Sequence, residues 1–332
     1  MSPLPCPYHV VLGITHTSTR TLGHLVAGAG CIALTYVCYR KLSSCCSAEA
    51  TAVSDSKDEE RKDGTVGVRS TASSGAVKGG GPAIYESARA VQEYLCFHFL
   101  RDLMPYDCGP KNALDFTKRM ADLCKKHAGQ TRLALDLGCA VGASAFELSK
   151  HYQEVVGLDF SHAFIEAAKD MQRGKKQTIT IQEEGDNFVD KVVTLPKGAN
   201  PQRITFTQGD ACKLPATHFG PFDCILCGNL LCRLPDPDAL LKRLPSLVNP
   251  SGIVVFVSPY SWLEEYTPKD KWYGGYLDKA GKPVDSATTL KSKMKSLGFS
   301  LVEEEQMPFL IREHARKFQL GFSHATVWRK KA

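Results

Sequence analysis

The sequence predicts an α/β protein built on a central, mostly parallel sheet with helices on both faces. Two observations predict this fold. From residue 132 onward, short apolar runs that end in polar residues alternate with segments whose apolar residues recur at helical spacing. The first of these runs leads through closely spaced glycines into a helix, as in nucleotide-binding units. Alternation of this kind indicates parallel strands that are buried on both sides.

Each element follows from a local pattern. Helices at 85–104 and 113–127 form an N-terminal helical extension before the first strand. The expected strands are 132–138, 154–160, 203–211, 222–231 and 252–260, and the expected helices between them are 143–152, 163–174 and 237–247. The long connection at 174–203 is an inserted flap, in which 178–182 and 191–195 can pair as a hairpin.

Composition narrows the class of protein. The chain has 332 residues, of which 43% are hydrophobic and 23% charged, and this excludes a disordered or fibrous protein. The formal charge of +6 is spread along the chain without a long basic tract, so it gives no reason to expect a nucleic-acid partner. The 13 cysteines fall at irregular spacings, which favours reduced thiols in a cytosol-facing domain.

The first 82 residues differ from the rest of the chain. Residues 21–39, within an N-terminal segment 1–42, form a mostly apolar run without formal charge and just long enough to cross a bilayer. We therefore expect a single membrane anchor, with a cleaved targeting peptide or a poorly ordered tail as alternatives. Residues 43–82 are rich in Ser, Ala, Gly and charge and predict a flexible linker. The folded domain is expected at 83–332.

Acidic residues follow successive strands at the edge where ligands bind in open parallel sheets. The loop after the first strand contains Asp136, Gly138, Ala140 and Gly142, and Asp159 ends the second strand. Small residues let a ligand approach the backbone, and a carboxylate at the end of the second strand can accept both hydroxyls of a ribose. The acid two residues before the first glycine disfavours a pyrophosphate but suits a cation such as S-adenosylmethionine.

Two further positions complete this pattern. Asp210, followed by Ala211, comes after the third strand and is placed for an adenine amino group, and Asn229 follows the fourth strand. The series resembles the class I, Rossmann-like S-adenosylmethionine-dependent methyltransferases from about residue 113 to the C-terminus. The resemblance implies S-adenosylmethionine as cofactor. The residues implied to bind it are Asp136, Gly138, Ala140, Gly142, Asp159, Asp210, Ala211 and Asn229.

A finer resemblance rests on five sequence blocks. They are YESARAVQEYLCFHF at 85–99, DLGCAVGAS at 136–144, GNLLCRLPDP at 228–237, SPYSWLEEYTPKDKWYGG at 258–275 and PFLIREHARKFQ at 308–319. Together they resemble the 4-mercaptohistidine N1-methyltransferase, usually the C-terminal module of ovothiol synthase. This implies methylation of the imidazole of 5-thiohistidine or a close analogue. Nothing here resembles the sulfoxide synthase half of such fusions, so another protein, a separate sulfoxide synthase, or the diet is expected to supply the substrate.

Several side chains are candidates for binding that substrate. Arg312 or Arg316, four residues apart in a segment with helical spacing, would bind its carboxylate, with a solvated surface as the alternative. The ends of the fourth and fifth strands offer groups for the ring and amine: Asn229, Tyr260, Trp262, Glu264 and Glu265. On the leading helix, Tyr85, Tyr94 and His98 could cap the pocket, although core packing is the alternative interpretation. Among all of these, Asn229, Tyr260, Arg312 and Arg316 are the predicted catalytic residues.

No metal site is predicted. Cys224 and Cys227 form a CxxC inside an apolar strand, where residues three apart face opposite sides, and no second ligand pair is present. Two competing functions stay open. One is a membrane-associated methyltransferase that acts on a lipid or quinone, for which the anchor is the only support. The other is a nonenzymatic cofactor-binding scaffold.

Overall fold

The structure, a computed structural model, describes residues 81–215 and 219–331. The chain divides into two units, 1–73 and 74–332, and every described residue belongs to the second. The predicted anchor at 21–39 and all but the last two residues of the predicted linker lie outside the described residues. Within the described ranges, no helix has the length and apolarity of a membrane span.

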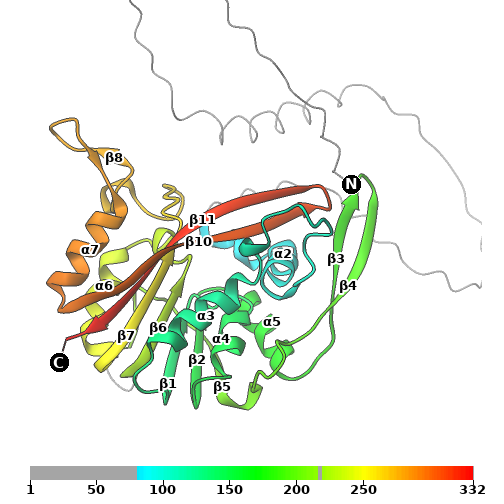
Figure 1. The fold of residues 1–332 in the computed structure, drawn as a ribbon, viewed down its shortest axis with the longest axis horizontal. Coiled ribbons are helices and arrows are strands. Elements are labelled where there is room, and N and C mark those ends of the chain that lie inside the picture. The colour runs from blue at the N-terminus through cyan, green and yellow to red at the C-terminus, as the bar shows by residue number, and fades with distance from the viewer. Residues whose placement is uncertain (1–80, 216–218, 332) are drawn as a thin grey trace, which may run out of the picture. The chain divides into compact units, whose positions relative to one another are not determined.

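The described residues form a seven-stranded sheet in the order β10-β11-β7-β6-β1-β2-β5 (Figure 1). Its parallel part is β1 (Leu133–Leu137), β2 (Glu154–Asp159), β5 (Ile204–Gln208), β6 (Phe222–Gly228) and β7 (Val248–Ser258). β10 (Phe299–His314) and β11 (Lys317–Lys330) pair antiparallel with each other, and β11 pairs antiparallel with β7. The predicted mostly parallel sheet is confirmed.

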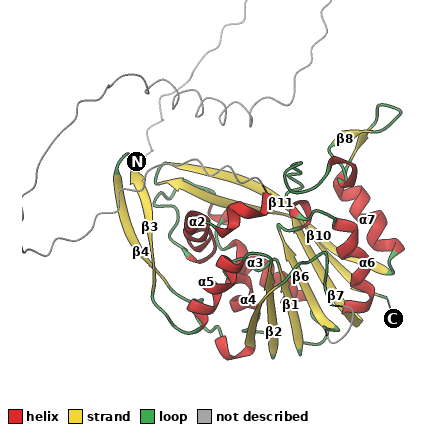
Figure 2. Ribbon diagram, turned by 180° about the vertical axis from the view of Figure 1, so that it is seen from behind, coloured by secondary structure: helices red, strands yellow, loops and turns green. Residues whose placement is uncertain are grey.

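Helices cover both faces of this sheet (Figure 2). α2 (Ala88–Phe99), α3 (Phe116–His127), α4 (Ala143–Leu148) and α5 (His162–Gln172) supply one apolar cluster. α6 (Pro237–Leu247) and α7 (Ser286–Ser296) supply the other. Four of these helices begin at a residue whose side chain accepts a hydrogen bond from the first turn: Ser87, Ser161, Asp236 and Asp285. Short 3-10 helices lie at η1 (Gly81–Glu86), η2 (Lys111–Ala113), η3 (Pro201–Arg203), η4 (Leu231–Arg233) and η5 (Lys269–Lys271).

Strand residues alternate between the two apolar clusters, as the period of two requires. In β1, Ala134 packs in the cluster under α3 and Leu135 in the cluster under α6. Cys224 and Cys227 of β6 divide in the same way and are both fully buried. The prediction that these two thiols face opposite sides of the sheet is confirmed.

Hairpins of different lengths extend beyond the parallel strands (Figure 1). β3 (Gln177–Glu184) and β4 (Asn187–Val193) form the predicted flap hairpin, and a small pair consists of β8 (Tyr276–Leu277) and β9 (Pro283–Val284). The other long hairpin is β10–β11. α2 lies beside the part of this hairpin that projects beyond the parallel strands (Figures 1 and 2), where Phe97 packs on Phe309.

The helical spacing read at 311–318, which put Arg312 and Arg316 on one helix face, is wrong, because this segment is the end of β10, a turn and the start of β11. Register shifts interrupt the β10–β11 ladder between Leu301 and Glu303 and between Arg312 and His314. Such bulges break the strict alternation of apolar and polar residues, so the local pattern imitates helical spacing. Pairing with β11, which begins three residues after β10 ends, determines this conformation rather than helix propensity.

Candidate active site

The loop between β1 and α4 is built from residues with left-handed backbone. Gly138, Ala140 and Gly142 have φ angles of 77°, 47° and 86°. A Cβ at Gly138 would lie 2.9 Å from Leu230, and one at Gly142 would lie 2.7 Å from the ring of Phe206. The loop can therefore pack this closely against Leu230 and Phe206 only because both positions lack a side chain.

Asp159 holds this loop from the end of β2. Its Oδ2 accepts a hydrogen bond from the Ala140 amide at 2.8 Å, and its Oδ1 accepts one from the Ser161 amide at 2.9 Å. Burial raises the pKa of Asp159, while these two amide bonds act in the opposite direction. The side chain stays partly accessible, so its remaining lone pairs can accept hydroxyl groups of a ligand.

Asp136 occupies a different environment one strand away. The side chain is 1% exposed, and the Ser144 hydroxyl donates to its Oδ2 at 2.6 Å. Burial raises the pKa of Asp136 to about 7. The predicted cation-facing acid is thus a buried carboxyl whose charge state changes near neutral pH.

The other predicted cofactor residues lie at the same edge. Asp210 follows β5 and accepts a hydrogen bond from the Cys212 amide at 2.8 Å, and Ala211 beside it is buried. Asn229 follows β6 with a φ of 52°, and its amide group accepts a hydrogen bond from Ser323 at 2.7 Å. The structure brings the predicted cofactor residues together at the carboxyl ends of β1, β2, β5 and β6.

Aromatic rings from η1, α2, α5 and a later loop gather over this edge. Tyr85 lies 6.0 Å from Tyr94, 6.0 Å from Tyr266 and 5.7 Å from Phe164 between ring centroids. Burial raises the pKa of both Tyr85 and Tyr94 to about 12, so both phenols stay protonated. Tyr85 and Tyr94 pack against the buried apolar cluster, which agrees with the core-packing interpretation, and a role in capping the site stays a prediction.

His98 lies one helical turn after Tyr94, with 5.2 Å between the ring centroids. Burial lowers its pKa to about 3, so the ring is neutral. Its Nδ1 is buried without a hydrogen-bond partner among the described residues.

The residues after β7 that were predicted to bind the substrate lie in different surroundings. Tyr260 has a φ of 50°, and its hydroxyl lies 3.0 Å from Nδ1 of His324, beside a 540 Å³ pocket. Trp262 is buried and donates to Ser286 at 2.9 Å, whereas Glu264 and Glu265 are exposed. Trp262 is therefore part of the packing, and Tyr260 is the residue of this group that borders a pocket.

The two arginines predicted to bind a carboxylate do not share a helix face. The Arg312 guanidinium on β10 is 4% exposed and donates to the Gln182 carbonyl and to Glu183, each at 2.7 Å. Arg316 is exposed in the turn before β11, over the ring of Tyr106. The common helix face predicted for them is absent here, and Arg312 instead joins the β10–β11 hairpin to the flap.

Sequence reasoning missed several polar residues at this edge. Ser323 and His324 are neighbours on β11, and they contact Asn229 and Tyr260. Arg233 donates to the Ser261 carbonyl at 2.5 Å and lies over the ring of Tyr266. The GNLLCRLPDP block contains Arg233 and could have identified it, but no local signal identified the β11 residues, because strand pairing alone brings them here.

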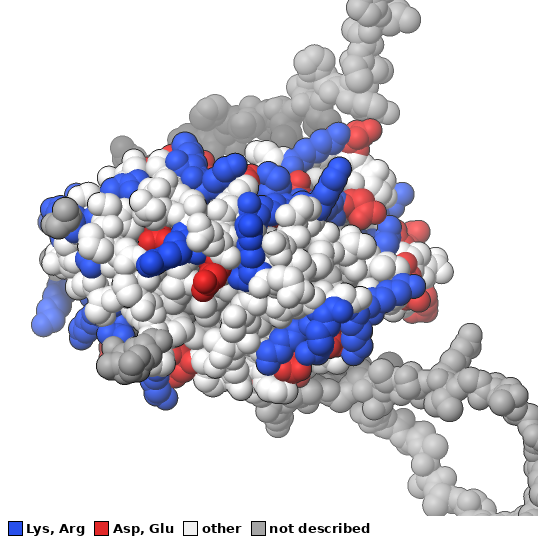
Figure 3. Space-filling model, turned by 90° about the horizontal axis from the view of Figure 1, so that it is seen from below, with Lys and Arg blue, Asp and Glu red and all other residues white. Residues whose placement is uncertain are grey.

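The hydrogen-bond acceptors and the backbone shape at this edge fit a cationic adenosyl ligand. Carboxylates end β2 and follow β5, a third is buried in β1, and the glycine positions are shaped for close contact. On the face seen in Figure 3, Lys and Arg side chains are interspersed with uncharged and acidic surface.

Comparison with known proteins supplies the family. Residues 92–304, more than half of the chain, match the family model described as a methyltransferase domain. The chain is 29% identical over 122 residues to ubiquinone biosynthesis O-methyltransferase of Coxiella burnetii, covering 37% of this chain and 41% of that protein. It is 25% identical over 143 residues to the enzyme of the same name from Aromatoleum aromaticum, covering 43% of this chain and 48% of that protein. The chain thus spans less than half the length of these relatives.

Solved structures with similar folds include a methyltransferase from Methanosarcina mazei, at 17% identity and a TM-score of 0.42, covering 62% of this chain and 95% of that one. Another is magnesium protoporphyrin IX methyltransferase from Synechocystis, at 15% identity and a TM-score of 0.42, covering 75% and 94%. Taken with the family match, the sheet and its glycine loop place this chain in the methyltransferase domain family as a class I S-adenosylmethionine-dependent methyltransferase.

Proposed function

We propose that this enzyme methylates a ring nitrogen of 5-thiohistidine, or of a close imidazole analogue. The observation that carries the proposal is the convergence of five blocks, at 85–99, 136–144, 228–237, 258–275 and 308–319. These blocks resemble the 4-mercaptohistidine N1-methyltransferase module, and they are far apart in the sequence. Their side chains meet around the carboxyl edge of the sheet.

Contacts link each block to another. Tyr85 of the first block packs on Tyr266 of the fourth at 6.0 Å, and Phe97 packs on Phe309 of the fifth at 6.0 Å. A Cβ on Gly138 of the second block would meet Leu230 of the third at 2.9 Å. A resemblance confined to the general fold would not require these contacts, because strands and helices of this class form without them.

For the cofactor, we assign the ribose hydroxyls to Asp159 and the adenine amino group to Asp210. The backbone from Gly138 to Gly142 then faces the amino acid end, with Asp136 buried behind it. When bound, S-adenosylmethionine supplies an electrophilic methyl group on a sulfonium. The chain's own residues orient the two reactants and exclude water.

An imidazole needs little activation as an acceptor. Its ordinary pKa of about 6.5 leaves a neutral ring nitrogen with a free lone pair at neutral pH. The site must instead distinguish two ring nitrogens from a neighbouring sulfur, which requires fixed hydrogen bonds to the acceptor. A separate sulfoxide synthase would supply the thiolated histidine.

A second candidate function has its own support. The curated relatives are named ubiquinone biosynthesis O-methyltransferases. A phenolic acceptor has an ordinary pKa of about 10, so its methylation at neutral pH needs a base in contact with the hydroxyl. Membrane attachment through residues 21–39 would agree with a lipid-soluble acceptor, and that attachment stays a prediction.

The test uses the full chain with S-adenosylmethionine that carries a heavy methyl group. Histidine, 5-thiohistidine, other imidazoles and a short-chain catechol-type quinol are incubated separately, and products are read by mass spectrometry. The proposal expects heavy methyl on a ring nitrogen of 5-thiohistidine. Transfer to the quinol alone would establish the second candidate instead.

A further inference from the structure

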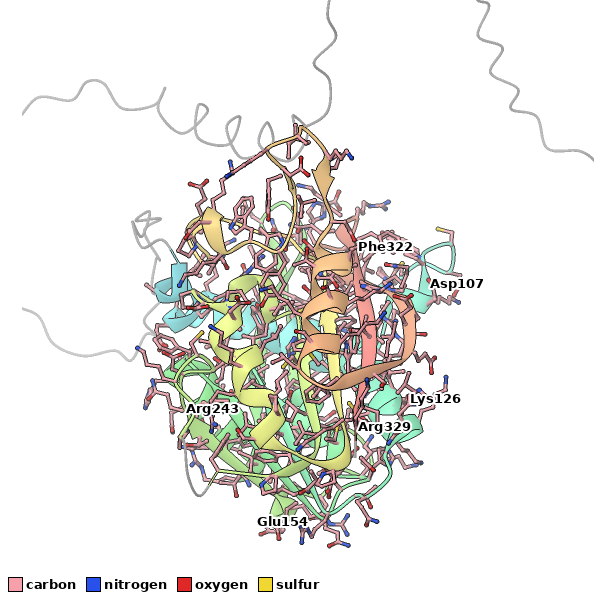
Figure 4. All side chains as sticks on the ribbon, turned by 90° about the vertical axis from the view of Figure 1, so that its left-hand side faces the viewer. Asp107, Lys126, Glu154, Arg243, Phe322 and Arg329 are labelled. Atoms are coloured by element: carbon pink, nitrogen blue, oxygen red, sulfur yellow. The ribbon has the colours of Figure 1, made fainter. Side chains whose placement is uncertain are left out.

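A pocket of 540 Å³ opens at the end of β7, on the side of the molecule that carries α7 and β11 (Figure 4, where Phe322 is labelled). Its lining includes Ser258 and Tyr260 from β7 and the following loop, Lys291 from α7, and Glu304 and His324 from β10 and β11. Its volume is in the range of small-molecule sites, and polar groups from four elements converge on it.

This pocket adjoins the predicted cofactor edge. The backbone N–H of Asn229 donates to the carbonyl of Val257 at 2.7 Å, and Val257 immediately precedes Ser258. On β11, Ser323 donates to the Asn229 side chain at 2.7 Å, and the next residue, His324, turns to the other side and contacts Tyr260. The pocket therefore lies at the same end of the sheet as Asn229, across β11 from it.

Three side chains in the pocket form a directed hydrogen-bond chain. The Tyr260 hydroxyl lies 3.0 Å from Nδ1 of His324, whose Nε2 lies 2.9 Å from Oε2 of Glu304. His324 is 9% exposed. The Lys291 ammonium contacts the same Glu304 oxygen at 2.5 Å.

The direction of this chain follows from Glu304. The ion pair with Lys291 lowers the pKa of Glu304, so the carboxylate is ionised and can only accept. It then accepts the Nε2 proton of His324, which leaves a lone pair on Nδ1 for the Tyr260 hydroxyl. Burial raises the pKa of Tyr260, so the phenol stays protonated and donates to His324. The lone pairs of the phenol oxygen are left for a donor in the pocket.

We propose that this pocket binds the methyl acceptor. The Tyr260 oxygen accepts a hydrogen bond from the ring N–H of the acceptor, and His324 and Glu304 are positioning residues that orient Tyr260. The inference rests on the proposed function, because it assumes an acceptor with an N–H group. The charges support an amino acid over a quinol, since Lys291 and the carboxylates of Asp285, Glu304 and Glu305 present both signs.

The hydrogen-bond chain from Tyr260 through His324 to Glu304 also accounts for the proton that methylation releases. The lone pair of one ring nitrogen forms the new N–C bond, and the C–S bond of the sulfonium breaks with its electron pair kept on sulfur. The second ring nitrogen becomes acidic, and its proton passes to the Tyr260 oxygen as the phenol proton passes to His324. The imidazolium formed on His324 is stabilised by Glu304 and releases its proton to solvent.

The experiment compares Tyr260→Phe, His324→Gln and Glu304→Gln with wild type in the full chain. Glu303→Gln is the matched control, because Glu303 is the adjacent residue on β10 and pairs with Lys126 instead. The readouts are kcat and KM for 5-thiohistidine, the ratio of N-methyl to S-methyl product, and affinity for S-adenosylhomocysteine by calorimetry.

For Tyr260→Phe we expect kcat/KM to fall about 10- to 100-fold with a larger share of S-methyl product, at the lower end of what acid-base groups contribute. Affinity for S-adenosylhomocysteine should stay within about twofold, and Glu303→Gln should match wild type. If His324→Gln fails to fold, Tyr260→Phe still decides the question. Unchanged kinetics and product ratio in Tyr260→Phe would overturn the inference alone. Wild type that methylates no imidazole would overturn the proposed function, and this inference with it.

Discussion

The two sides of the sheet's carboxyl edge are held together by different means. At β1 and β2, backbone amides of Ala140 and Ser161 bond directly to Asp159, and glycines allow the loop to pack closely. At β7 and β11, side chains that are far apart in the sequence, Tyr260, His324 and Glu304, bond to one another. The first arrangement is fixed by the backbone, whereas the second depends on side-chain chemistry.

Because of this difference, mutations in the two halves of the site should affect different properties of the enzyme. Changes in the β1–β2 half alter backbone conformation, so they should reduce stability and cofactor affinity together. Changes in the β7–β11 half remove a functional group from a strand that stays paired, so they should reduce catalysis while the fold persists.

The largest effect is expected at Gly142. Its φ of 86° disfavours a side chain, and a Cβ would lie 2.7 Å from Phe206. Gly142→Ala should lower the free energy of unfolding by about 3 kcal/mol and abolish measurable cofactor binding. Denaturant unfolding and calorimetry with S-adenosylhomocysteine check both.

Gly174→Ala is the control for Gly142→Ala. Gly174 has a similar φ of 75°, but a Cβ there would meet nothing within 4 Å. It should cost only about 1 kcal/mol of backbone strain and leave cofactor affinity unchanged. Equal losses in the two variants would mean that close packing of the loop is unimportant.

Asp136 gives the next effect, a pH dependence. Burial raises its pKa to about 7 in the folded protein, above the ordinary 3.8. The folded state therefore binds more protons than the unfolded state between these values, and this carboxyl's stabilisation falls as pH rises from about 4 to 7. The loss is on the order of 4 kcal/mol over this range, since each pKa unit corresponds to about 1.4 kcal/mol.

Asp136→Asn should remove that slope, which is measured as the difference in unfolding free energy between variant and wild type at pH 5, 6, 7 and 8. Relative to wild type, the variant should gain stability as pH rises. A difference that stays constant across this range would show that Asp136 keeps an ordinary pKa.

The β1–β2 half could be predicted from sequence because its signals are local. Asp159 follows a short apolar strand, and the glycines of the first loop are within a few residues of one another, so spacing alone placed them. The β10–β11 half could not, since bulges near Arg312 disturb its pattern and the contacts of His324 depend on pairing with a distant strand. The assignment of Arg312 to a helix failed for this reason.

Asp159→Ala tests the β1–β2 half by removing the carboxylate to which its backbone amides bond. Two amides lose their acceptor, and any ribose hydroxyls lose theirs. Affinity for S-adenosylhomocysteine should fall about 100-fold, since hydrogen bonds to a charged group contribute about 1.5–3 kcal/mol. Unchanged affinity by calorimetry would remove Asp159 from the cofactor site.

The smallest effect separates the two arginines. Arg312→Met removes a buried guanidinium from two contacts with the flap and should cost about 2 kcal/mol of stability without raising KM for the acceptor. Arg316→Met, at an exposed turn, should change stability by less than about 0.5 kcal/mol. A large rise in KM with unchanged stability in Arg312→Met would restore its role in binding a carboxylate.

The most direct test is a crystal structure of the protein with S-adenosylhomocysteine and 5-thiohistidine bound together. The account predicts the adenosyl ribose on Asp159 and the acceptor ring beside Tyr260, with one ring nitrogen facing the sulfur of the cofactor product. An acceptor bound under α2 near His98, with the Tyr260 pocket empty, would contradict the division of the site into these two halves.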